Sequence, residues 1–177
     1  MKHLLLLGAL AALPGAVLAA PAVNFHGEVS TQTCQITING ATNSIVLLPP
    51  VAAAELAPAG TPVEAGHFDV SVTECTAAAS NTPIYINFLG HNVTPDGHLG
   101  NIATANAATD VAIGVKAGPS MVNGSLILDG VSQVRNMLLL KGDTSTSQQF
   151  VVFYVSEGGN PTPGAVTGVM EYAISYQ

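Results

Sequence analysis

A short stretch near the N-terminus, residues 23–29, alternates apolar and polar side chains. One parity carries Val23, Phe25, Gly27 and Val29, and the residues between them are Asn, His and Glu. A period of two residues is typical of a β-strand that buries one face. The stretch therefore predicts a strand close to the start of the chain.

The apolar parity changes immediately after this strand. Cys34, Ile36 and Ile38 alternate at even positions, and the polar residues 30–33 separate the two stretches. One regular strand cannot bury both sets of side chains on the same face, because successive residues point to opposite faces. The pattern predicts an arm at 20–29 followed by a globular body at 30–177. The alternative is a self-contained sandwich in which 23–29 is simply the first strand and Gly27 marks a bulge.

Residues 1–19 have the features of a secretory signal. Lys2 supplies a positive charge and an apolar run follows at 4–18, which is too short to span a bilayer. We expect cleavage after Ala19, because cleavage after Ala20 would place Pro21 directly beyond the broken bond. An N-terminal membrane anchor is the less favoured alternative. The exported chain of about 158 residues has the length of one domain.

Two cysteines, Cys34 and Cys75, remain after export. In an oxidising compartment, an isolated pair most simply forms a disulfide, and a metal or redox pair would need CxxC-type spacing.

The charge of the chain argues against nucleic acid as a partner. The exported chain has three basic residues against eleven acidic ones. No basic patch is available to neutralise phosphates, so we expect no nucleic-acid partner.

The body contains several short apolar alternations bounded by turn residues. Residues 150–154 are apolar on both faces, as a central strand should be, and a helical turn is possible at 51–56. Short strands without a long helical period predict an all-β antiparallel sandwich. The alternating strands are expected at 34–38, 68–72, 84–88, 111–115, 126–128 and 169–177.

No recognised catalytic motif occurs in the chain, and we expect neither an enzyme nor a cofactor. His91, Asp96 and His98 lie in one polar loop, and imidazole and carboxylate can ligate metals. Solvent-exposed loop residues are the favoured interpretation, because no HExxH, CxxC or EF-hand pattern accompanies them.

Several groups of residues follow spacings that occur together in one protein family. Phe25-x-Gly27 lies in the arm, Cys34 follows Gly27 by seven residues, and Tyr176 is penultimate. The other groups are Phe68-x-Val70-x-Val72-x-x-Cys75 and Thr162-Pro163-Gly164. Over nearly the whole exported chain these motifs resemble the chaperone–usher pilins, most closely the major subunits of type 1 fimbriae. The arm is also as short as those of minor or adaptor pilins, so shaft and adaptor roles both stay open.

The resemblance implies an incomplete immunoglobulin-like sandwich that lacks its seventh strand and has a hydrophobic groove beside its last strand. It implies that a periplasmic chaperone first fills this groove. At an outer-membrane usher, the arm of a neighbouring pilin subunit then replaces the chaperone, which is a known form of β-strand addition. The expected function is a non-enzymatic structural subunit of an adhesive fimbrium on the bacterial surface, exported through the periplasm.

The resemblance also assigns roles to residues at the two ends. Val23, Phe25, Gly27 and Val29 are expected to form the donor strand. The groove and the chaperone are expected to contact the apolar face of the last strand, namely Met170, Tyr172, Ile174 and Tyr176. A secreted carbohydrate-binding sandwich is the alternative function, although the absence of Trp weakly disfavours it.

Overall fold

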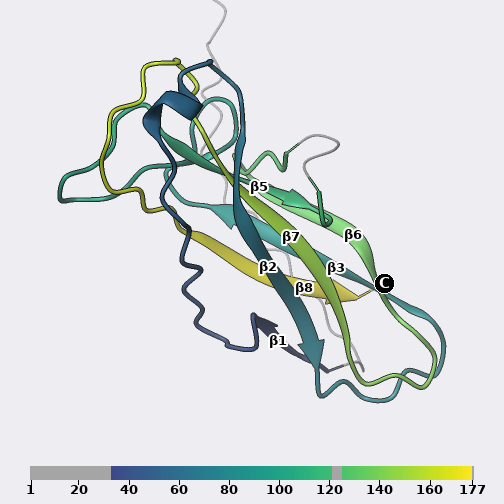
Figure 1. The fold of residues 1–177 in the computed structure, drawn as a ribbon. Coiled ribbons are helices and arrows are strands. Elements are labelled where there is room, and N and C mark those ends of the chain that lie inside the picture. The colour runs from purple at the N-terminus through teal and green to yellow at the C-terminus, as the bar shows by residue number, and fades with distance from the viewer. Residues whose placement is uncertain (1–32, 121–124, 177) are drawn as a thin grey trace, which may run out of the picture.

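The computed structural model describes residues 33–120 and 125–176 (Figure 1). The proposed signal at 1–19 and the arm at 20–29 therefore lie outside the described residues. No helix in the described part is long and apolar enough to cross a membrane. The elements are β1 (Gln35–Ile38), a 3₁₀ turn (Ala53–Leu56), β2 (Val63–Thr73), β3 (Thr82–Gly90), β4 (Leu99–Gly100), β5 (Ala112–Ala117), β6 (Val131–Leu139), β7 (Thr146–Val155) and β8 (Met170–Tyr176).

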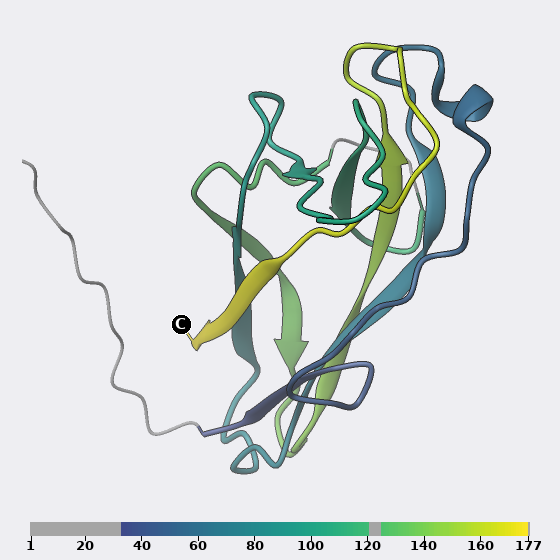
Figure 2. The same cartoon turned by 90° about the vertical axis from the view of Figure 1, so that its left-hand side faces the viewer.

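The strands form two sheets that pack face to face (Figure 2). One has the order β1-β2-β7-β5-β4 and the other has the order β6-β3-β8. All of the strand pairs are antiparallel. The prediction of an all-β antiparallel sandwich is confirmed. Within the described residues, β1 and β8 are both edge strands, one in each sheet.

Strand β7 is the centre of the larger sheet, as its apolar composition predicts. Every residue from Phe150 to Val155 is buried. On the inner face, the Phe150 ring stacks on Phe68 and meets Phe88 edge-on, both at 5.2 Å between ring centroids. On the outer face, the Phe153 ring covers Gly114, where an added Cβ would lie 2.0 Å from Cζ of the ring. Apolar packing thus occupies both faces of β7.

The predicted disulfide is confirmed by a bond between Cys34 and Cys75. Cys34 precedes β1 and Cys75 follows β2, and these strands pair in register from Gln35 opposite Thr73. The bond therefore fixes the end of the β1–β2 pair and holds edge strand β1 against its sheet.

Two segments differ from the sequence-based expectation. Residues 126–128 form no strand, although the Leu126 amide donates to the Val115 carbonyl at 2.8 Å. The Leu128 amide donates to a different segment, at the Gly97 carbonyl at 2.9 Å, so the two bonds do not form a ladder with one partner strand. Strand β6 starts at Val131, well before the apolar run at 137–140. Its early inward positions are Ser132, opposite Phe88, and Val134, opposite Ile86, so they give no apolar alternation that the sequence would reveal.

One charged side chain, Lys116, is buried on the outer face of β5. It is 3% exposed, and its Nζ has no hydrogen-bond partner within the described residues. A buried polar group without a partner costs about 1–3 kcal/mol. Lys116→Met keeps a slightly shorter unbranched side chain and removes the ammonium, and we expect it to raise the free energy of unfolding by about that amount.

Urea unfolding of the monomer at neutral pH measures this effect. Lys141→Met is the control, because Lys141 is exposed and its replacement should change stability by less than about 0.5 kcal/mol. A Lys116→Met protein no more stable than the parent would contradict the cost assigned to this ammonium.

Candidate functional site: an apolar groove beside the last strand

The last strand, β8, buries its apolar face only in part. Met170, Tyr172, Ile174 and Tyr176 share one parity and pack against the core, yet each is only half-buried. One edge of β8 pairs with β3, with Ile86 opposite Ile174 and Phe88 opposite Tyr172. The equivalent face of β3 is fully buried. The difference arises because β8 is the edge strand of its sheet in the described chain.

A groove of about 560 Å³ opens between β8 and the segment that follows β1. One wall is residues 44–48, and the other is residues 166–170 with Tyr172. Core side chains form the floor, so the groove reaches the interior of the sandwich. These floor residues are Ile38, Phe68, Leu99, Ile113, Val115, Val152 and Tyr154.

The wall at 44–48 also exposes large apolar side chains. Ile45 is 85% exposed and Leu47 is 88% exposed, whereas Val46 and Leu48 pack against the core. A contiguous apolar surface of this kind, open to the core, typically marks an interaction site. The cavity lies between this wall and residues 166–170 at the start of β8.

The structure divides the predicted groove residues into two pairs. Met170 and Tyr172 line the groove. Ile174 and Tyr176 share their parity and contact the core, but they do not line this cavity. The predicted donor residues Val23, Phe25, Gly27 and Val29 lie outside the described residues.

Sequence reasoning missed the opposite wall of the groove. Residues 45–48 are apolar at both parities, so no alternation indicates which of them face the core. The signal that was available is the Pro49-Pro50 pair, which ends the run and argues against a central strand.

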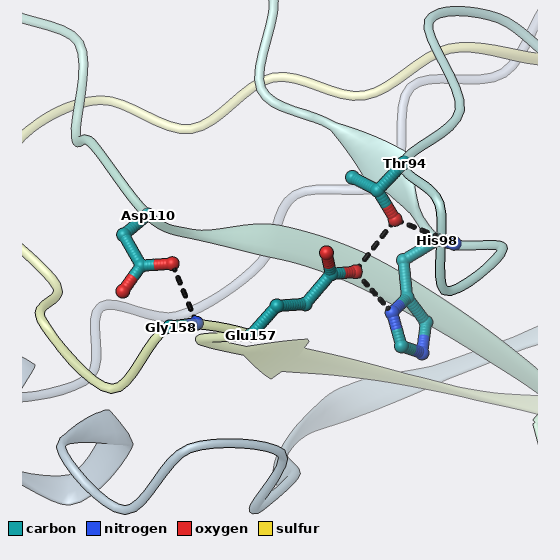
Figure 3. Close-up of polar contacts among 5 residues, drawn as sticks. All are labelled: Thr94, His98, Asp110, Glu157 and Gly158. Atoms are coloured by element: carbon teal, nitrogen blue, oxygen red, sulfur yellow. Dashed lines mark hydrogen bonds and ion pairs between the residues drawn. The ribbon is translucent and has the colours of Figure 1, made fainter.

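The loop histidines do not converge on one site. His98 Nδ1 lies 2.8 Å from Glu157 Oε1, and the Thr94 hydroxyl donates to the same oxygen at 2.5 Å (Figure 3). His91 instead pairs with Glu171 on β8 at 2.9 Å. Within the described residues, no group of three or more His, Cys, Asp or Glu side chains could hold a metal ion.

A second carboxylate, Asp110, organises the turn after β7. Its oxygens accept hydrogen bonds from the Ser156 hydroxyl at 2.7 Å and from the amides of Gly158 at 2.9 Å and Asn160 at 2.7 Å (Figure 3 draws the Gly158 bond). The hydrogen bond from Ser156, and after it those from the Asn160 and Gly158 amides, lower the pKa of Asp110 below its ordinary value. These contacts hold together the end of the sandwich where the 156–160 turn meets β5.

Comparison with known proteins identifies the family of this chain. A family model described as fimbrial protein matches residues 23–177. The protein belongs to the fimbrial protein family. The chain is 31% identical to the major fimbrial subunit SMF-1 of Stenotrophomonas maltophilia strain K279a, over 94% of this chain and 99% of that protein. The resemblance to pilins predicted from the sequence motifs is therefore confirmed.

Solved pilus structures share the fold of this fimbrial subunit. The P pilus rod subunit PapA matches with a TM-score of 0.58 at 16% identity, covering 81% of this chain and 99% of PapA. A subunit from a chaperone–usher pilus structure matches with a TM-score of 0.58 at 18% identity, covering 93% and 100%. The Burkholderia pseudomallei antigen and type I fimbria protein BPSL1626 matches with a TM-score of 0.55 at 15% identity, covering 82% and 100%.

Proposed function

We propose that this fimbrial subunit is a structural, non-enzymatic component of a chaperone–usher fimbria and polymerises by donor-strand exchange. The groove between residues 44–48 and β8 carries the proposal, because it opens onto the core of the sandwich. An extended apolar strand laid there would cover the floor and pair with the edge of β8.

The arm at 20–29 is the proposed occupant, supplied by a neighbouring subunit. Its apolar parity matches an apolar groove, and burial of Val23 or Phe25 would contribute about 1.5–3 kcal/mol each. Gly27 suits a position where two backbones approach closely. Because the arm and the groove are different surfaces of one molecule, the contact does not close and propagates into a filament.

The remaining assignments concern the export and assembly of the subunit. The signal at 1–19 is removed after Ala19 on export to the periplasm, and residues 30–177 fold as the pilin domain. A periplasmic chaperone covers the face of β8 that carries Met170, Tyr172, Ile174 and Tyr176. The outer-membrane usher then exchanges the chaperone for the neighbouring arm, and the filament extends from the cell surface and supports adhesion.

A charge placed in the groove tests this function. We expect Met170→Asp to lower assembly at least about 10-fold, because it removes a buried apolar contact and would strand a carboxylate under the incoming strand. The assay follows the heat-labile ladder of high-mass species that collapses to monomer on boiling. Ala173→Asp is the matched control, since Ala173 lies on the same strand but is exposed.

The circular dichroism spectrum of each monomer checks that the sandwich still folds. Equal ladders from folded Met170→Asp and Ala173→Asp proteins would overturn the assignment of the groove as the acceptor site.

A further inference from the structure

The groove is bridged at one position by a hydrogen bond. The Tyr172 hydroxyl donates to the Thr42 carbonyl at 2.5 Å, between residues 130 positions apart. Tyr172 belongs to β8 in the three-stranded sheet, and Thr42 follows β1 in the other sheet. A side chain from one wall therefore reaches the backbone beyond the other wall.

The carbonyl that accepts this bond lies in a well-anchored turn. Ile38 and Ala41 exchange reciprocal backbone bonds at 2.9 and 3.0 Å. Asn39 and Gly40 have φ values of 49° and 81°, as a two-residue hairpin turn requires. The Asn39 side chain accepts from the Asp69 amide at 2.9 Å, and the Ser44 hydroxyl donates to the Ile38 carbonyl. Thr42 is thereby held in place opposite Tyr172.

The bridge coincides with the end of the open part of the groove. Met170 and Tyr172 line the cavity, whereas Ile174 and Tyr176, further along the same face, do not. A strand that enters between residues 44–48 and 166–170 and continues along β8 must cross the line joining Tyr172 Oη to Thr42 O. The bond and a fully seated strand exclude each other.

The geometry points to Tyr172 as a gate within the groove. The gate separates an open compartment beside Met170 from the stretch beside Ile174 and Tyr176. Its Tyr172–Thr42 bond stabilises the empty groove, and an incoming strand breaks this bond in order to seat along the whole of β8. This inference rests on the proposed function, for which it names a residue that sets the rate of strand capture.

Tyr172→Phe tests the gate, because it removes the hydroxyl and keeps the ring. A neutral hydrogen bond present only in the empty state would, on removal, raise strand affinity about 2- to 12-fold. The probe is a fluorescein-labelled peptide of residues 20–29, captured by dilute mature protein, with association rate and affinity read from anisotropy. We expect both to rise. Tyr85→Phe is the matched control, because Tyr85 lies on the outer face under Arg135, and it should change neither value.

A second readout needs no peptide. Amide hydrogen exchange of residues 41–44 in the empty protein should speed up in Tyr172→Phe and stay unchanged in Tyr85→Phe. Unchanged or weaker capture by Tyr172→Phe, or unchanged exchange at 41–44, would overturn the gate while leaving strand capture by the parent intact. Failure of the parent and both variants to capture the peptide would overturn the proposed function and the gate with it.

Discussion

Deleting residues 20–29 is expected to give a subunit that folds and accepts a strand but cannot supply one. The disulfide, the two sheets and the groove are all built from residues that lie after this segment, within 33–120 and 125–176. The segment carries the apolar parity of Val23, Phe25 and Val29, which under the proposal fills the groove of a neighbour. Expressed alone, the deleted protein should form no filaments.

Mixing the deleted protein with the intact protein sharpens this prediction. Each filament has one end at which a subunit uses only its groove, so a filament should contain at most one deleted subunit, at that end. Immunogold labelling of a tag on the deleted protein measures this directly. Labels at several positions along one filament would show that assembly does not need the arm.

Point substitutions in the arm test whether assembly depends on the apolar face of the arm and not only on the presence of the segment. Phe25→Ser removes about 1.5–3 kcal/mol of apolar burial and should impair assembly strongly. His26→Ser alters the adjacent residue of opposite parity and serves as the control, with near-normal assembly. Equal effects of the two substitutions would contradict a strand with one buried face.

Loss of the Cys34–Cys75 bond is the second large effect that we expect. The two cysteines are 41 residues apart in sequence, and closing a loop of this length stabilises a protein by about 4 kcal/mol on the chain-entropy model. Domains are typically stable by only about 5–15 kcal/mol. A double Cys34→Ser, Cys75→Ser protein should therefore unfold at a markedly lower urea concentration and yield little assembled material.

The bond also has a local consequence for the groove. It fixes edge strand β1, and the groove wall at 44–48 directly follows the turn after β1. Hydrogen exchange at 35–48 should rise more than exchange in β7 when the bond is absent. Dithiothreitol should destabilise the parent protein and leave the double-serine protein unchanged. Normal assembly of the double-serine protein would show that β1 pairing alone holds this wall.

The local sequence pattern was sufficient to predict a strand where the strand has one buried face. The alternations at 68–72, 84–88 and 111–115 became β2, β3 and β5, and the doubly apolar 150–154 became the central β7. The oxidising compartment implied by the predicted signal at 1–19 was enough to predict the disulfide, because the chain has only two cysteines to pair. These features follow from side-chain periodicity and redox chemistry, which act over short distances or on very few groups.

Local pattern failed where a residue's environment depends on distant parts of the chain. Residues 45–48 are apolar at both parities, so nothing nearby predicts that Ile45 and Leu47 are exposed while Val46 and Leu48 face the core. Lys116 is a second example. A lysine in an alternating strand is expected to be exposed, and only the packing of the sheet buries this one.

The sequence alone determined the family through its motif spacings, the disulfide through its single pair of cysteines, and the strand-rich sandwich through its alternations. Three-dimensional packing decided which segment faces β8 across the open core, how far the cavity extends along that strand, and that the Tyr172 hydroxyl meets the Thr42 carbonyl. Those outcomes depend on how two sheets lie against each other, and contacts between residues as far apart as 42 and 172 leave no periodic trace along the chain.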